Sequence, residues 1–239
     1  LSSFGDNLSG GGLGSSSSFS VALVQALCKL SQIDISQLDA ANVASDIEIN
    51  KLKKPIGRQD QYLCSIGGIN IIKINEKNQV ELFNENKVIK AINSYIKDLF
   101  IVNTGKARSA NTTLLKIKSH KDSFESIKEI YDIANNFLIE SSKLNHDNIV
   151  HLLDESVKES WKIKKNMSAV MNDSLSLIET KLTTFNFEIK KLLGAGGGGY
   201  FLVKYIGKSL KKDLDNLEKE NLKITKFELD NVGSKSWKI

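Results

Sequence analysis

The chain has 239 residues, which is enough for one large domain or two small ones. Its hydrophobic content of 41% and charged content of 26% are ordinary for a globular protein. The net charge of +5 comes from lysines interleaved with acidic residues, without a block of five or six like charges, so no nucleic-acid-binding arm is indicated. No stretch reaches the ~18 apolar residues of a membrane span. The positive excess would suit anionic small substrates, although a solvated lysine-rich surface explains it more simply.

Cysteine and histidine positions do not indicate a metal centre. Cys28 and Cys64 lack ligand spacing, as do His120, His146 and His151. We therefore expect two reduced thiols in a cytoplasmic protein, because no signal peptide is visible either. The chain starts with Leu1 and becomes glycine-rich almost at once, so we expect it to be part of a longer product.

The first half of the chain predicts two helices and two strands. Apolar residues recur at helical spacing over residues 18–30 and again over 35–50. Residues 51–62 are expected to form a loop, and residues 67–74 a turn that enters a strand. A short buried strand over 99–102 ends in a polar turn at 103–105.

The second half is richer in helix. Helices are predicted over residues 123–144, 147–165 and 174–187, with the last the weakest. A glycine-rich segment at 193–199 precedes a strand at 200–205, a charged helix at 209–221 and a strand at 224–229. Helices and strands alternate irregularly, which favours an α+β fold with helices on one face of antiparallel sheets.

The segment from Ser9 to Ser18 combines glycines with serines directly before the first predicted helix. Glycines allow backbone amides to approach a ligand, and a helix start offers unpaired N–H groups and a positive dipole end. This combination suits phosphate, and a serine hydroxyl there could also bind Mg²⁺. It is neither a Walker A loop nor a dinucleotide fingerprint, and a flexible low-complexity terminus is an equally good interpretation of this segment alone.

Two further segments carry possible chemistry. Asp60 lies in Gly57–Tyr62, and Glu48 lies on the second predicted helix, so one carboxylate could hold Mg²⁺ while the other accepts a hydroxyl proton. By itself Asp60 is more simply a surface carboxylate. Gly194–Gly199 leads into an apolar strand and indicates either close backbone packing beside a ligand or a tight loop without one.

In this order, these segments resemble the motifs of the GHMP kinase superfamily, which includes galactokinase, homoserine kinase and mevalonate kinase. The similarity is greatest to the heptose 7-phosphate kinases. It covers essentially the whole chain and rests on five segments: Gly57–Tyr62, Asn103–Ala110, Leu152–Ser156 with Trp161–Lys165, Leu193–Gly199 and Gly233–Trp237.

The resemblance implies a two-domain fold. Residues 1–95 would form a partial N-terminal α/β domain that binds ATP, and residues 96–239 a ferredoxin-like C-terminal domain of antiparallel sheet and helices. The implied reaction is the ATP- and Mg²⁺-dependent phosphorylation of the anomeric hydroxyl of a sugar, with D-glycero-D-manno-heptose 7-phosphate as the first choice. Kinases for fucose, galactose or a uronic acid, and an inactive or non-catalytic relative, stay open. The resemblance gives no oligomeric state, and no nucleic acid or membrane partner is expected.

The resemblance also implies roles for individual residues. Asp60 would be the catalytic base and Arg58 would neutralise charge near the transferred phosphoryl group. Ser16 and Glu48 would be the Mg²⁺ ligands. The loop that wraps the ATP phosphates would consist of Gly10, Gly11, Gly12, Leu13, Gly14, Ser15, Ser16 and Ser17. The substrate side would be formed by Gly57, Gln59, Thr104, Arg108, Gly196, Gly197 and Gly198.

The chain departs from the family pattern in several places. The first family motif, an N-terminal strand and turn, is absent, and Leu8 replaces the proline that usually precedes the phosphate loop. The lysine-rich stretch 50–54 and the longer segment 154–161 also differ. The missing first motif removes expected substrate contacts.

Overall fold

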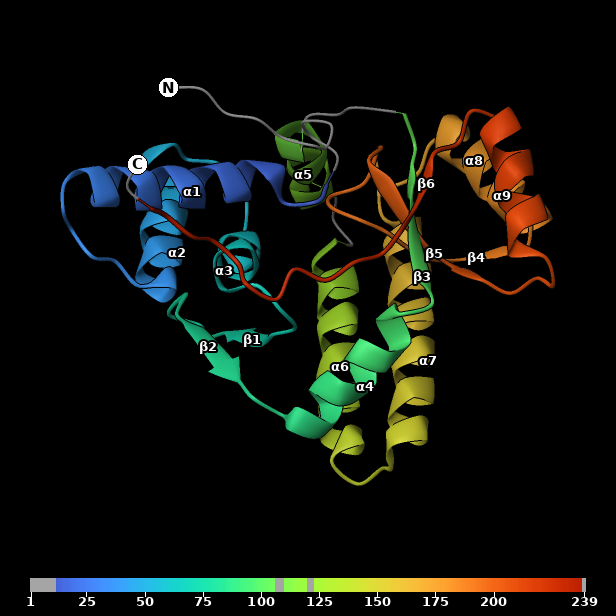
Figure 1. Cartoon of the computed structure of the whole chain (residues 1–239), viewed down its shortest axis with the longest axis horizontal. Helices are drawn as coiled ribbons and strands as arrows, with labels where there is room; N and C mark the ends of the chain where they lie inside the picture. Colours follow the sequence, from blue (N-terminus) through green and yellow to red (C-terminus); the bar gives the residue numbers. More distant parts are fainter. Residues whose placement is uncertain (1–11, 106–109, 120–122, 238–239) are drawn as a thin grey trace. The chain divides into compact units, whose positions relative to one another are not determined.

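A computed structural model describes residues 12–105, 110–119 and 123–237 of the chain. The chain divides into two compact units, seen in Figure 1. Of the described residues, 14–85 and 229–237 belong to the first unit, and 12–13 and 86–228 to the second. The division in mid-chain thus falls between residues 85 and 86, earlier than the predicted boundary at 95/96, and the C-terminal tail joins the first unit.

The first unit consists of packed helices and one β-hairpin. Its helical elements are α1 (Ser15–Leu30), α2 (Gln37–Asp46), the π-helix η1 (Ile47–Lys51) and α3 (Gln59–Ile66); β1 (Ile71–Ile74) and β2 (Val80–Phe83) pair antiparallel. The side chain of Ser36 accepts a hydrogen bond from the Asp39 amide and caps α2. The loop that the sequence predicts over residues 51–62 extends too far, because α3 already begins at Gln59.

Helix α1 buries a different face from the one that its sequence predicts. Val21 and Val24 pack with Ala40 and Ala44 of α2 to form a small core. Phe19 is 48% exposed and Leu30 is 80% exposed, although both belong to the predicted apolar stripe. The helix carries apolar residues on two faces, and packing against α2 and α3 uses only one of them.

The C-terminal tail packs against the ends of α2 and α3 within the first unit. The Gln37 side-chain amide donates to the carbonyl oxygens of Val232 and Ser234, over 3.0 and 3.1 Å. The hydroxyls of Ser65 and Ser234 lie 3.1 Å apart. Trp237 at the end of this tail is 75% exposed.

The second unit is built on a four-stranded antiparallel sheet with strand order β4-β5-β3-β6. Helices α5–α8 connect β3 to β4, and α9 connects β5 to β6, which gives the β-α-β-β-α-β order of a ferredoxin-like fold. The unit's elements are α4 (Asn86–Ile96), β3 (Leu99–Asn103), α5 (Ala110–Ser119), α6 (Ser123–Ser141), α7 (His146–Asn166), α8 (Asp173–Thr184), β4 (Phe187–Leu192), β5 (Tyr200–Tyr205), α9 (Leu210–Lys219) and β6 (Ile224–Lys226).

Burial in the second unit follows the strand alternation and the inner helix faces. Val102 of β3 and Phe201 of β5 are paired and both fully buried. They pack with Trp161 of α7 and Leu182 of α8, and the rings of Trp161 and Phe201 meet edge to face. This core confirms the α+β fold and the antiparallel C-terminal sheet.

A buried charge cluster joins α4, α7 and β4 in the second unit. Lys190 is fully buried and donates to Asp154 and to Glu188, the latter at 2.9 Å. The Tyr95 hydroxyl also donates to Asp154, and Lys158 pairs with both acids. Burial raises the pKa of Asp154, but these hydrogen bonds and the Lys190 charge outweigh it and lower the pKa to about 2. The cluster therefore keeps its carboxylates ionised.

No helix in the described ranges is long and apolar enough to cross a membrane.

Candidate active site

Helix α1 starts directly after a left-handed glycine turn. Gly12 and Gly14 both have positive φ, at 82° and 72°. Gly14 is the N-cap residue, so no side chain satisfies the first amides of α1, and its first turn contains no acidic residue. The positive helix end is therefore left available to an anion. Of the predicted phosphate loop, Gly12, Leu13, Gly14, Ser15, Ser16 and Ser17 lie in the described ranges, whereas Gly10 and Gly11 lie outside them.

The two predicted metal ligands are brought together in the first unit. The Ser16 hydroxyl donates to Glu48 Oε1 over 3.2 Å. Glu48 lies in the first turn of η1, where the widened helix continues α2 and presents this side chain to α1. Such π-turns inside helices occur frequently at functional sites. The sequence predicted this pairing although the two residues are far apart in the chain.

Two further side chains complete the surroundings of Glu48. The Lys54 ammonium donates to Glu48 Oε1 over 2.6 Å, and Gln61 Nε2 donates to Oε2 over 2.7 Å. Glu48 and Gln61 are both fully buried. Sequence reasoning missed both partners. Gln61 could have been found from its spacing to Ser65 on the inner face of α3, whereas nothing distinguishes Lys54 from the neighbouring lysines.

Glu48 is held in its ionised form. Burial by itself raises the pKa of Glu48, but hydrogen bonds from Lys54, Gln61 and Ser16, together with the Lys54 charge, leave the pKa below its ordinary value. An ionised carboxylate beside a hydroxyl is a hard oxygen donor set, and Mg²⁺ is commonly bound by one or two protein oxygens plus substrate phosphates. The residues present therefore fit the implied Mg²⁺. Within the described residues no group of three or more His, Cys, Asp or Glu side chains forms a metal cluster.

Asp60 lies in the first turn of α3, next to this pair. Its side chain is exposed at the surface. Neighbouring protein atoms remove part of the hydration of the Asp60 carboxylate, which raises its pKa. A hydrogen bond with Gln59 lowers the pKa, and the negative charge of Glu48 raises it. Asp60 is thus a more basic carboxylate than usual and can accept a proton. Gly57 and Gln59 are exposed beside it.

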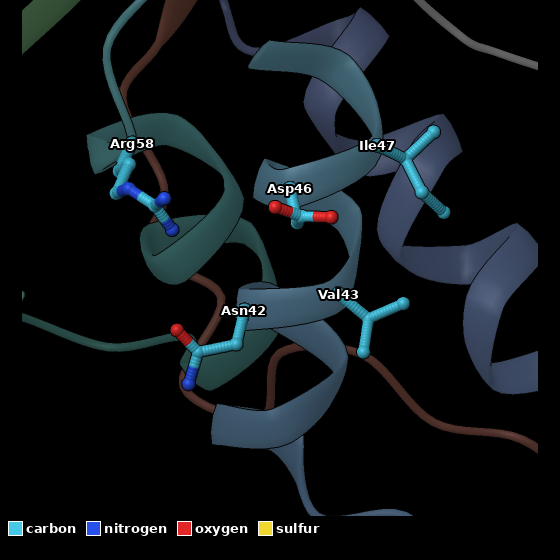
Figure 2. Close-up of a pocket in the computed structure, with 5 residues that line it drawn as sticks. All are labelled: Asn42, Val43, Asp46, Ile47 and Arg58. Atoms are coloured by element: carbon cyan, nitrogen blue, oxygen red, sulfur yellow. The ribbon is translucent and has the colours of Figure 1, made fainter. Parts of the chain in front are cut away.

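Arg58 precedes α3 and faces a surface pocket of about 400 Å³. Figure 2 shows its side chain on the same hollow as Asn42 and Asp46 of α2, with Val43 and Ile47 completing the lining. The guanidinium therefore lies beside polar groups of α2 in this structure. The predicted part of Arg58 in catalysis stays a prediction.

The thiol of Cys64 lies under the glycine turn. Its sulfur is 3.7 Å from the carbonyl oxygen of Gly14, to which it donates. Burial, with smaller contributions from the Asp60 and Glu48 charges, raises the pKa of Cys64 to about 11. Cys64 is free, as expected from the sequence, and its raised pKa makes it a poor nucleophile at neutral pH.

The second glycine segment is packed backbone to backbone in the second unit. A Cβ atom on Gly196 would lie 2.6 Å from Val170 Cα, and the Gly197 amide donates to the Val170 carbonyl over 2.8 Å. A Cβ atom on Gly12 would lie 2.7 Å from the carbonyl oxygen of Leu193. Only glycine fits these approaches. The segment therefore lies against Gly12.

Thr104 locks this glycine segment to the end of β3. Its hydroxyl donates to the Gly199 carbonyl over 2.8 Å and accepts from the Gly199 amide over 3.0 Å. Thr104 is buried, at 5% exposure. The structure thus gives its side chain a role in holding the loop, and its predicted contact with substrate stays a prediction. Arg108 lies outside the described residues.

Several known proteins are similar to this chain in sequence or in fold. Residues 5–68 match the model of the GHMP kinases N terminal domain. The D-glycero-alpha-D-manno-heptose 7-phosphate kinase of Campylobacter jejuni is 26% identical over the whole chain, which covers 70% of that protein. A mevalonate kinase structure has a TM-score of 0.65 at 19% identity, with 91% of this chain and 65% of that one covered. A D-glycero-D-manno-heptose 1-phosphate kinase from Bacteroides thetaiotaomicron has a TM-score of 0.63 at 18% identity, with 99% and 66% covered.

Ser16 and Glu48 both lie within the segment 5–68 that matches the GHMP kinases N terminal domain, and the fold of the chain is similar to the folds of the two kinase structures. Among its relatives the heptose phosphate kinases match it over nearly all of its length. The chain spans about two thirds of the length of the two solved structures.

Proposed function

We propose that this chain carries the nucleotide, metal and base groups of an ATP-dependent kinase that phosphorylates the anomeric hydroxyl of D-glycero-D-manno-heptose 7-phosphate. The observation that carries the proposal is the hydrogen bond from Ser16 to the buried Glu48 carboxylate, directly after an uncapped glycine turn. Phosphoryl transfer depends on positioning and charge neutralisation, and these groups supply both.

The glycine turn and the start of α1 would hold the ATP phosphates. Glycines 12 and 14 keep side chains away from the backbone, and the free amides of the first turn of α1 donate to phosphate oxygens. Ser16 and Glu48 would hold Mg²⁺, which neutralises phosphate charge when bound. Arg58 would add positive charge near the transferred group.

Asp60 would accept the proton of the sugar hydroxyl. An anomeric hydroxyl is a comparatively acidic alcohol, so a carboxylate with a raised pKa is an adequate base. Asp60 stands at the N-terminus of α3, where its exposed carboxylate is accessible to a substrate. Gly57 and Gln59 would lie on the substrate side of the same turn.

The phosphate of the sugar would be bound by a basic side chain. Arg108 would offer a two-pronged donor to this phosphate, with Thr104 and Gly196–Gly198 shaping the neighbouring backbone. The name of the 26% identical relative, a heptose 7-phosphate kinase, supports a sugar phosphate as substrate.

The test is ATP consumption with a panel of heptose 7-phosphate, heptose 1-phosphate, galactose and fucose. Turnover with heptose 7-phosphate above all others is expected. Turnover only with another sugar would contradict the substrate, and ATP binding without turnover on any sugar would support a non-catalytic relative. Ser16→Ala should weaken Mg²⁺–ATP binding, measured by calorimetry, whereas Ser18→Ala on the exposed face of the same helix turn should not. Equal binding by both variants would remove Ser16 from the site.

A further inference from the structure

The Glu48 carboxylate is bonded by three side chains of the first unit. Ser16 and Lys54 both donate to Oε1, over 3.2 and 2.6 Å, and Gln61 donates to Oε2 over 2.7 Å. Oε1 is therefore the oxygen shared between the Ser16 hydroxyl and the Lys54 ammonium. A cation held jointly by Ser16 and Glu48 would use this same oxygen.

An ammonium group and a divalent cation exclude each other at one carboxylate oxygen. Mg²⁺ binds oxygen at about 2.0–2.1 Å, and a full positive charge 2.6 Å from that oxygen would repel it strongly in a buried site. Resting on the proposed metal role of Ser16 and Glu48, we propose that Lys54 and a divalent cation are alternative partners of Glu48, so that the cation binds only when Lys54 leaves.

The two sides of the ion pair differ in their freedom to move. Lys54 keeps 29% of its side chain exposed on the segment that follows η1, and its flexible stem can swing into solvent. Its backbone stays in place, because the Lys54 amide donates to the Glu48 carbonyl over 3.0 Å. Glu48 is fully buried and cannot follow.

Gln61 keeps the carboxylate in position when Lys54 leaves. Its Nε2 binds the Glu48 oxygen that Lys54 does not use. Gln61 is fully buried, and its Oε1 has no hydrogen-bond partner within the described residues. The exchange therefore changes the partner of one oxygen only. It requires movement of a lysine side chain, with no rearrangement of α2 or α3.

Cation binding can be measured directly with Mn²⁺ alone, from the electron paramagnetic resonance signal of free Mn²⁺. Lys54→Met should bind Mn²⁺ at least about tenfold more tightly than the unmodified chain, because the competing charge is gone. Lys54→Arg, which keeps the charge, should bind no more tightly. Lys51→Met is the matched control: Lys51 is an exposed neighbour on η1, and its removal should change affinity less than about twofold.

A second measurement uses the unmodified chain and does not depend on the folding of any variant. Amine labelling at Lys54, quantified by mass spectrometry of its peptide, should rise severalfold when Mg²⁺ is added, while labelling at Lys51 stays constant. Unchanged labelling at Lys54 under Mg²⁺ saturation would overturn the exchange.

Glu48→Gln separates this inference from the proposed function. If Lys54→Met binds Mn²⁺ no more tightly while Glu48→Gln abolishes binding, the metal site stands and the competition is refuted. If Glu48→Gln leaves Mn²⁺ binding unchanged, the metal role of Glu48 fails, and the competition fails with it. Tighter binding by Lys54→Met that is lost again in Lys54→Met/Glu48→Gln establishes both.

Discussion

Gly67 and Gly233 pack backbone against backbone, with no room for a side chain on either. A Cβ atom on Gly67 would lie 2.3 Å from the Gly233 nitrogen, and one on Gly233 would lie 2.3 Å from the Ser65 carbonyl oxygen. Both glycines have positive φ, at 71° and 68°. The contact attaches the C-terminal tail to the end of α3.

This contact predicts a large difference between two adjacent glycines. Gly67→Ala should destabilise the chain by more than about 2 kcal/mol, because it adds a backbone clash to an unfavourable φ. Gly68→Ala has a similar φ of 71°, but its Cβ would meet only a side-chain oxygen of Asn231 at 4.0 Å, so about 1 kcal/mol is expected. Melting temperatures from scanning calorimetry measure both, and equal losses would contradict the packing argument.

Changing Asp60 to Asn should lower kcat by about 10²–10⁴-fold with heptose 7-phosphate while sparing ATP binding. The reason is that the amide cannot accept a proton. As the pH is lowered, kcat of the unmodified chain should fall when Asp60 becomes protonated. Because the pKa of Asp60 is raised, this fall should occur at a higher pH than for an ordinary aspartate. Asp46→Asn serves as the control, because Asp46 is a carboxylate that lines the pocket faced by Arg58. Retained kcat in Asp60→Asn would remove it from the mechanism.

The charge cluster around Lys190 predicts both a mutational and a pH effect on stability. Lys190→Met leaves Asp154 with Lys158 and the Tyr95 hydroxyl, and Glu188 with Lys158, and should cost about 2–3 kcal/mol, less than a buried pair left with no partner. Lys158→Met, at a site 37% exposed, should cost less than about 1 kcal/mol. Urea unfolding monitored at Trp161 fluorescence measures both variants, and the opposite order of losses would refute the burial argument.

The pH effect of this cluster follows from the lowered pKa of Asp154. Its folded pKa of about 2 lies below the ordinary 3.8, so the carboxylate stabilises the fold above pH 3.8. This contribution of about 2 kcal/mol is lost as the pH falls from 3.8 toward 2. Asp154→Asn should flatten the acid limb of the stability curve in that window, and an unchanged limb would contradict the assignment.

Two substitutions of Thr104 separate its structural role from its predicted contact with substrate. Thr104→Val removes both side-chain hydrogen bonds with Gly199, keeps the one from the residue 104 amide, and should cost about 1–3 kcal/mol, whereas Thr104→Ser keeps the hydroxyl and should cost less. A rise in KM for the sugar phosphate in Thr104→Ser, with stability retained, would indicate a substrate contact as well. Unchanged stability in Thr104→Val would contradict the loop-holding role.

Periodic and glycine patterns predicted the fold where local sequence determines structure. The helix at α1 and the strand Tyr200–Tyr205 were predicted from such patterns. Helix α4 was missed although Val88, Ala91 and Tyr95 recur at helical spacing. The helix predicted over 174–187 ran past the end of α8 at Thr184, and strand β4 was missed, because Phe187 continues an apolar pattern that changes from helix to strand. Packing decides such boundaries.

The same distinction applies to the site. Ser16, Glu48 and Asp60 were predicted through family motifs, and the structure brings Ser16 and Glu48 into contact. Lys54 could not be predicted, because its importance arises from a three-dimensional contact with a buried carboxylate and it lies in a stretch with two other lysines, Lys51 and Lys53. The buried face of α1 also depended on its packing partners.

The return of the tail to α3 has a consequence for the order of folding during synthesis. Residues 86–228 are contiguous and complete the second unit before residues 229–237 are made, whereas the first unit waits for its last segment. Gly233 can therefore pack on Gly67 only after residues 229–237 have been made. We expect a chain truncated after residue 228 to protect the second unit from protease while α3 remains susceptible. Equal protection of α3 with and without residues 229–237 would show that the first unit closes without its tail.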